Sequence, residues 1–361
     1  EGVFISAYRK DKPALWFEGQ LTQNGETVEI GTDESWICVR EDSVKLIQAA
    51  GVHSSIPPLE EILGSQVLTP VEVRGMYGPN VGNRCYNIFG IAEPYPMVPR
   101  LIPQMETHPA KEMKVLRQGD GFIELDAGMY TTAKVSLAAC AKAGSEIRII
   151  YAECYTVADE NGNRYKGRRD DFENPTSRLD GYADIIHANG QVQELNTFWY
   201  RSFRFIRIEF DKDAGFELEH LSFSPYFYPL DHMGSFECSN PRFNDMWNIS
   251  RNTVLCCMHE MYVDCPYYEQ QQYGMDSTLE MLFTFRLGSD NLMPLQSLTD
   301  LAHSQIYAGM LQANYPSNAT QVIPNFTLYW VLMLREYLRY TGKIADVRQL
   351  LGTMDKALQA F

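Results

Sequence analysis

The chain has 361 residues, of which 45% are hydrophobic, and it carries a formal net charge of −15. This length is enough for two or three domains, each with its own core. The negative charge argues against binding to nucleic acid, which depends on clustered lysine and arginine, so neutral or cationic partners are expected. No apolar run is long enough to span a bilayer, so membrane insertion is not expected.

Eight cysteines are scattered along the chain without the paired spacing or neighbouring histidines of a zinc site. Neither a metal nor another cofactor is therefore expected. The adjacent Cys256 and Cys257 suit a buried helix with reduced thiols better than a disulfide framework. The first residues lack the order of a signal peptide, although the chain could start after one. The compartment stays open, with a periplasmic or other extracytoplasmic location favoured over the cytoplasm.

The first two predicted domains are β structures. Residues 1–112 are expected to form an antiparallel, jelly-roll or lectin-like module, in which Asn24-Gly25 indicates a tight hairpin. Prolines from Glu93 to Pro109 exclude a helix interior or a central strand, so this stretch is an extended connector. Residues 113–230 are expected to form a β-sandwich, because strand patterns such as KVSLAACA and FRFIRIEF alternate with glycine-containing turns. Within them, the charged stretch at 159–175 is interpreted as a solvated loop.

Residues 231–361 are predicted to be helical. Five stretches repeat at helical spacing, and they begin with NPRFNDMW, STLEMLF, LMPLQSL, FTLYWVL and IADVRQL. Short loops join them, so neighbouring helices are expected to stack as hairpins.

The segment DCPYYEQQQYGMD, residues 264–276, places three carboxylates among aromatic and glutamine side chains. Asp264 precedes Pro266, as an N-cap carboxylate ahead of a first-turn proline would. Glu269 and Asp276 are two helical turns apart and would lie on one stripe. That stripe continues through Tyr273, Leu279, Phe283 and Leu287.

A carboxylate that leads into a buried stripe must be paired, hydrogen-bonded or protonated. A general acid with a raised pKa is built in this way. The alternative is that Glu269 and the three glutamines after it form a solvated helix start. Trp330 lies in an apolar helix, where core packing is the ordinary role, but aromatic rings also stack on sugars, so it is a candidate sugar contact.

DCPYYEQQQYGMD resembles the segment of bacterial α-L-rhamnosidases in which Asp-Cys-Pro is followed by a Glu, an aromatic residue and a final Asp. MGSFECSNPRFNDMWNISRNT and NTFWYRSFRFIRIEF extend the resemblance, which covers most of residues 80–361. It implies a multidomain β plus α fold, with β-sandwich modules followed by the beginning of an (α/α)6 barrel of the six-hairpin glycosidase type. Such a barrel needs twelve helices, so residues 231–361 are expected to be its incomplete N-terminal portion.

The resemblance also implies roles for individual residues. It makes Glu269 the general acid, Asp264 and Asp276 hydrogen-bonding partners of rhamnose hydroxyls, and Tyr273 the aromatic residue against the sugar. Met275 stands where the family usually has glycine. Only protonated Glu269 can donate, so activity should fall on the alkaline side.

The implied function is an inverting glycoside hydrolase that releases terminal α-L-rhamnose from oligosaccharides, polysaccharides or glycosides. Its base is expected beyond Phe361. A chain ending there should be inactive alone and should self-associate through exposed apolar helix faces. Two alternatives stay open: a non-catalytic carbohydrate-binding protein of the same architecture, and a six-hairpin glycosidase acting on another sugar.

Overall fold

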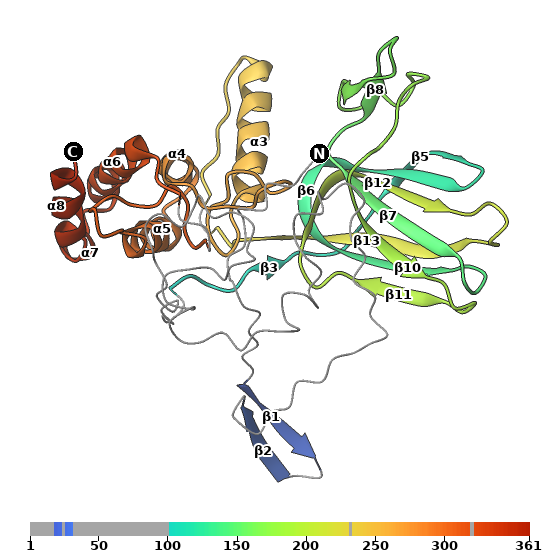
Figure 1. Ribbon diagram of the computed structural model, residues 1–361, viewed down its shortest axis with the longest axis horizontal. Coiled ribbons are helices and arrows are strands. Elements are labelled where there is room, and N and C mark those ends of the chain that lie inside the picture. The colour runs from blue at the N-terminus through green and yellow to red at the C-terminus, as the bar shows by residue number, and fades with distance from the viewer. Residues whose placement is uncertain (1–17, 24–25, 32–100, 231–232, 318–320) are drawn as a thin grey trace, which may run out of the picture. The chain divides into compact units, whose positions relative to one another are not determined.

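The computed structural model describes residues 18–23, 26–31, 101–230, 233–317 and 321–361 (Figure 1). The chain divides into two compact units, and the first consists of Glu1–Tyr95 with Pro316–Gln321. Within this unit the structure describes an antiparallel hairpin of β1 (Glu18–Gln23) and β2 (Glu26–Gly31). The pairing confirms the predicted hairpin, although its turn residues lie outside the described ranges. Most other predictions for the first hundred residues also concern residues outside the described ranges.

The second unit contains a nine-stranded antiparallel sheet with the order β10-β7-β12-β6-β13-β3. β5 and β11 also pair with β6, and β4 pairs with β13. The strands are β3 (Glu106–Thr107), β4 (Lys111–Glu112), β5 (Lys114–Gly119), β6 (Phe122–Cys140), β7 (Glu146–Ala152), β10 (Tyr182–His187), β11 (Gln193–Asn196), β12 (Arg201–Phe210) and β13 (Glu217–Phe227). A separate hairpin consists of β8 (Thr156–Ala158) and β9 (Arg164–Lys166). The β structure predicted for residues 113–230 is therefore confirmed, whereas the sandwich arrangement stays a prediction.

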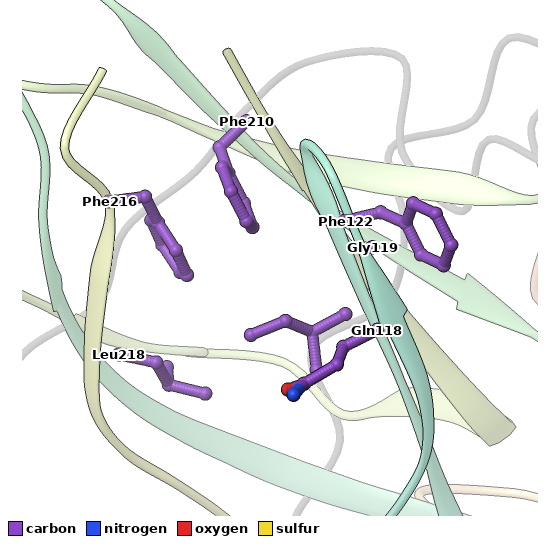
Figure 2. Close-up of a pocket in the computed structure, with 7 residues that line it drawn as sticks. Gln118, Gly119, Phe122, Phe210, Phe216 and Leu218 are labelled. Atoms are coloured by element: carbon purple, nitrogen blue, oxygen red, sulfur yellow. The ribbon is translucent and has the colours of Figure 1, made fainter. Parts of the chain in front are cut away.

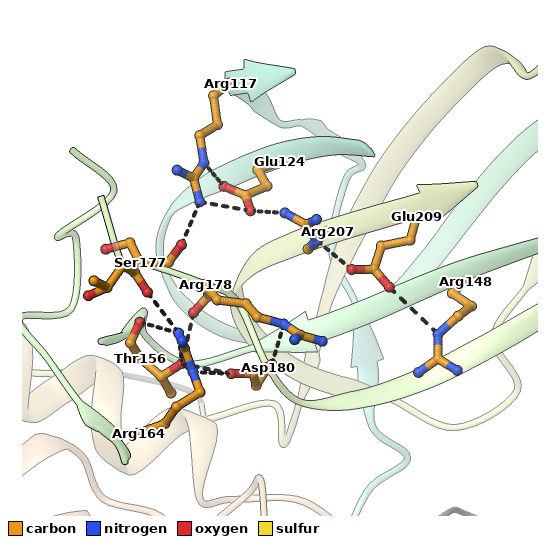
Figure 3. A network of polar contacts seen from close by, with 11 residues as sticks. Arg117, Glu124, Arg148, Thr156, Arg164, Ser177, Arg178, Asp180, Arg207 and Glu209 are labelled. Atoms are coloured by element: carbon orange, nitrogen blue, oxygen red, sulfur yellow. Dashed lines mark hydrogen bonds and ion pairs between the residues drawn. The ribbon is translucent and has the colours of Figure 1, made fainter. Parts of the chain in front are cut away.

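Alternating side chains of the long strands form the apolar core of the sheet, among them Leu137 of β6, Ile149 of β7 and Phe203 of β12. A buried carboxylate lies at one side of this core. Glu124 of β6 accepts hydrogen bonds from Arg117, Arg207 and the hydroxyl of Tyr155. Figure 3 shows Glu124 between the two guanidinium groups. Because Glu124 is fully buried, its charge must be compensated by these partners.

The part of the chain after the sheet is helical, as predicted, within the described residues. The helices are α3 (Pro241–Cys256), α4 (Gly274–Leu287), α5 (Leu292–His303), α6 (Pro324–Thr341), α7 (Ile344–Arg348) and α8 (Leu351–Gln359). The side chain of Asn240 caps α3, and Pro241 occupies its first turn. Gly342 ends α6 in a left-handed conformation, with φ of 68°. The last predicted helix is divided into α7 and α8.

The helical core includes Met281 of α4, Leu298 of α5, and Trp330 and Met333 of α6. Segments that flank the sheet also enter this core. Ile102, Met105 and Tyr228 are buried within it, and the hydroxyl of Tyr228 donates a hydrogen bond to Asp290 at 2.7 Å. The sheet and the helices of the second unit therefore share buried contacts. No helix in the described part of the chain combines the length and apolar character needed to cross a bilayer.

Candidate functional site

Residues 264–273, here called the acid loop, are not helical. The loop closes on itself, because the backbone N–H of Asp264 donates to the carbonyl of Gln271 at 2.8 Å, and the N–H of Gln271 donates to Asp264 Oδ1 at 3.0 Å. Gln270 has φ of 54°, which a helix excludes. The predicted helix start was therefore wrong, and so was the N-cap interpretation of Asp264. Helix α4 begins only at Gly274, with Tyr273 as its N-cap residue.

The apolar stripe predicted on α4 is only partly present, because Leu287 is buried but Leu279 and Phe283 are not. Leu279 and Phe283 are 39% and 49% exposed, whereas Ser277, Met281 and Thr284 are buried. The inward face carries small residues because the backbone of α6 approaches closely there. The hydroxyl of Thr278 reaches the carbonyl of Tyr329 at 3.3 Å. Close packing between helices, rather than hydrophobicity alone, determines which face is buried.

The structure nevertheless brings the predicted acids together. Tyr273 donates a hydrogen bond from its hydroxyl to Glu269 Oε2 at 2.7 Å. Burial raises the pKa of Asp264 and of Asp276, and the negative charge of Glu269 raises both further. The carboxyl groups of all three acids are therefore close enough to influence one another, and all three side chains are half-buried. In the described residues, no group of acidic, histidine or cysteine side chains could hold a metal ion.

Two further acids with raised pKa values lie on helices α4 and α5, and the sequence prediction missed them. Glu280 follows Asp276 by one helical turn and is only 9% exposed, with one carboxyl oxygen that has no hydrogen-bond partner among the described residues. Burial raises its pKa well above the usual value, and Asp276 and Asp264 act in the same direction. Asp300 of α5 accepts a hydrogen bond from Gln272 at 3.4 Å, and burial raises its pKa to about 7. Glu280 could have been found from the sequence, because it is an acidic residue at a position of α4 that faces the core.

Residues of the sheet and of the segment before β12 hold the acid loop by hydrogen bonds. Ser202 of β12 donates to the carbonyl of Pro266 at 2.7 Å, and Tyr267 donates to the carbonyl of Tyr151 at 2.7 Å. Trp199 Nε1 donates to Gln270 Oε1 at 3.3 Å. These contacts join residues far apart in the sequence. The sheet thus positions the loop that carries Asp264 and Glu269.

Trp330 does not belong to the site. Its ring is fully buried in the helical core, and its indole N–H donates to the carbonyl of Leu298 at 3.0 Å. A ring enclosed on all sides has no face for a sugar. The predicted sugar contact is therefore corrected to a core residue.

A groove of about 600 Å³ lies elsewhere on the sheet (Figure 2). It is lined by Gln118, Gly119, Phe122, Ile123, Phe210, Phe216 and Leu218. Phe210 is at the far end of β12 from Ser202, the residue that holds the acid loop. The lining contains no acid, so this groove offers no group for proton transfer.

The geometry of the acid loop suits a polyhydroxylated ligand. Carboxylates accept hydrogen bonds from hydroxyl groups, and a carboxyl group held by a phenol can serve in proton transfer. Asp264, Glu269, Tyr273 and Asp276 supply these groups within one site, because three come from the loop and Asp276 from the first turn of the helix that follows.

Comparison with known proteins gives consistent results. The model of the bacterial alpha-L-rhamnosidase six-hairpin glycosidase domain matches residues 231–360. An alpha-L-rhamnosidase of Formosa agariphila is 27% identical over 157 residues, which make up 43% of this chain and 16% of that protein.

Two solved structures are similar in fold. A rhamnosidase from Klebsiella oxytoca with rhamnose bound has a TM-score of 0.59 at 15% identity, and the match covers 72% of this chain and 57% of that one. The GH78 family rhamnosidase of Bacillus sp. GL1 has a TM-score of 0.57 at 25% identity, with 73% of this chain and 26% of that one covered. The chain therefore spans less than two thirds of the length of each of these relatives.

Proposed function

We propose that the acid loop is part of a site that hydrolyses α-L-rhamnosides, because residues 231–360 match the model of the bacterial alpha-L-rhamnosidase six-hairpin glycosidase domain. Glu269 is the general acid that protonates the oxygen of the leaving group. Asp264 and Asp276 bind hydroxyl groups of a terminal rhamnose, and Tyr273 lies against the sugar. The substrate is a rhamnose-containing glycan or glycoside.

One observation carries this proposal. Two acids, Asp264 and Asp276, lie near Glu269, five residues before it and seven after it in the sequence, although Asp264 and Glu269 lie in a loop and not in a helix. Half-burial and a hydrogen bond from Tyr273 hold Glu269 in one orientation. A general acid needs such a fixed position next to the oxygen that it protonates.

We further propose that the reaction inverts the anomeric centre, as the family pattern implies. An inverting hydrolase uses a second carboxylate, on the opposite face of the sugar, to activate water. Asp264 and Asp276 are assigned to the sugar hydroxyls in this scheme. The base is expected from the later part of the barrel.

The test compares Glu269→Gln with the wild type in the complete protein. Glutamine keeps the size of the side chain but cannot donate a proton, so kcat on a rhamnosyl disaccharide should fall by about 10²-fold or more. An aryl rhamnoside with an activated leaving group needs less protonation and should lose less. Glu160→Gln, in an exposed turn of the sheet domain, is the matched control. Wild-type turnover of the disaccharide by Glu269→Gln would remove Glu269 from this role.

A further inference from the structure

Next to the acid loop, three tyrosines from two distant segments meet. The ring of Tyr267 lies 4.7 Å from that of Tyr268 and 5.1 Å from that of Tyr182, the first residue of β10. Tyr267 is buried, whereas Tyr182 and Tyr268 are 41% and 43% exposed. One buried ring thus supports two rings that face solvent.

The position of these rings is fixed by backbone contacts. The hydroxyl of Tyr267 accepts a hydrogen bond from the N–H of Tyr182 at 3.1 Å and donates one to the carbonyl of Tyr151. A Cβ atom at Gly181 would lie 1.9 Å from that carbonyl and 2.3 Å from the Tyr267 hydroxyl. Glycine at 181 is therefore required for this close approach. The two exposed rings are held in place before any ligand arrives, which lowers the entropic cost of binding.

A charged pair borders the exposed rings. Lys166 of β9 lies 4.8 Å from the centre of the Tyr268 ring, and its ammonium group is 3.0 Å from Glu153 Oε2. The predicted solvated loop at 159–175 therefore contributes a side chain to this surface. Because the two charges compensate each other and the acid loop is negative, the surface favours a neutral ligand over an anion.

This surface adjoins the part of the acid loop that carries Glu269, the proposed general acid. Tyr268 immediately precedes Glu269 in the chain. Tyr182 is within electrostatic reach of Cys265, and the thiol of Cys265 accepts a hydrogen bond from the N–H of Glu269 at 3.3 Å. The group that Glu269 would release must lie beside Glu269. The exposed tyrosines and the Lys166–Glu153 pair thus border the turn of residues 265–269, which carries Glu269.

We propose that Tyr268, Tyr182, Lys166 and Glu153 bind the leaving group, and that this group begins with a neutral pyranose ring. Phenol rings present flat apolar surfaces that suit the C–H face of a pyranose. The ammonium and carboxylate groups can hydrogen-bond the hydroxyls at its edge. The inference rests on the proposed function. It adds which residues of the sheet region recognise the leaving group of the substrate.

The test uses two substrates that share rhamnose but differ in leaving group. One is a disaccharide with α-L-rhamnose linked to glucose, and the other is α-L-rhamnosyl fluoride, whose leaving group has no ring. In the complete protein, Tyr268→Ala and Tyr182→Ala should each lower kcat/KM for the disaccharide by about tenfold or more. The values for the fluoride should change by less than about threefold, which also shows that the variants fold. Tyr307→Ala, at a fully exposed tyrosine, is the matched control and should leave both values at the wild-type level.

The other outcomes separate the two proposals. Unchanged disaccharide kinetics in both variants would overturn the leaving-group site alone. Equal losses on both substrates would also overturn it, since the tyrosines would then support the acid loop rather than the leaving group. A wild-type protein that hydrolyses neither substrate would overturn the proposed function and this inference with it.

Discussion

Glu280 is the acid of the site that is most shielded from water, and its protonation state affects the stability of the fold. Burial, with Asp276 and Asp264 nearby, raises its pKa well above the usual 4.5. The folded protein therefore binds a proton here more tightly than the unfolded chain does. This contribution to stability is fully present below about pH 4.5 and is lost as the pH rises toward the folded pKa.

Replacing Glu280 by Gln should remove this dependence, because the amide stays neutral at every pH. The free energy of unfolding of Glu280→Gln minus that of the wild type should increase between pH 4 and pH 8. The increase should be about 1.4 kcal/mol for each unit by which the folded pKa is raised. Urea titrations at several pH values measure it, with Glu160→Gln, at an exposed carboxylate, as the control variant. A flat difference for Glu280→Gln would mean that Glu280 is solvated in the folded protein.

The hydroxyl of Tyr267 joins two backbone groups of the sheet to the acid loop, so its removal tests the anchoring directly. Tyr267→Phe leaves the carbonyl of Tyr151 and the N–H of Tyr182 without this partner, and unfolding should become easier by about 1–3 kcal/mol. Denaturant titration measures the change. The same substitution at exposed Tyr307 should have almost no effect. Equal values for the two variants would show that the Tyr267 bonds contribute nothing to stability.

At the scale of structural elements, the buried carboxylate of Glu124 and its hydrogen-bond partners stabilise strand β6. Burial acts to raise the pKa of Glu124, but hydrogen bonds from Arg117, Tyr155 and Arg207 outweigh it and lower the pKa. Glu124→Gln leaves Arg117 without its anion and leaves Arg207 with Glu209 alone, which should cost about 3–5 kcal/mol of stability at pH 7. The difference between wild type and variant should shrink as the pH falls below about 4.5, because Glu124 takes up a proton in the unfolded chain before it does so in the folded protein. Glu146→Gln, at a carboxylate that is 54% exposed, serves as the control.

The helices were predictable from the sequence because each one carries local signals. Asn240 and Pro241 mark the start of α3, and Gly342 marks the end of α6. The acid loop was not predictable in this way. Its conformation depends on hydrogen bonds to Tyr151 and Ser202, which are 116 and 64 residues away from their partners in the chain. The helical spacing of the residues around Glu269 carries no information about these long-range contacts.

The spacing of the acids was still informative, although for a different reason from periodicity. Asp264, Glu269 and Asp276 meet because the loop folds back before α4 begins, and not because they share a helix face. Trp330 shows the opposite case. Its position in an apolar helix favoured the core, and the burial of its ring confirms that ordinary interpretation. The sequence could not decide between core and sugar contact for an aromatic side chain.

At the scale of the whole molecule, the described helices expose apolar side chains in a row. Phe243, Met246 and Ile249 of α3 are 53%, 59% and 66% exposed. Such a row favours association. The 361-residue chain should self-associate in solution, and replacing all three residues by serine should lower the mass measured by light scattering. Phe198→Ser, at an isolated exposed residue, should leave the mass unchanged. A monomeric wild-type chain would contradict this prediction.

The hydrogen bonds between the acid loop and the sheet have a consequence for how such genes can recombine. The matched glycosidase domain starts at residue 231, but the partners of the loop, Tyr151, Tyr182, Trp199 and Ser202, are encoded upstream of that boundary. A crossover at residue 231 that brings in a foreign sheet would separate Glu269, the proposed general acid, from the residues that position its loop. A recombinant gene therefore keeps a working acid loop only if the sheet and the helical domain come from the same parent. The alternative is a donor sheet that offers the same four partners.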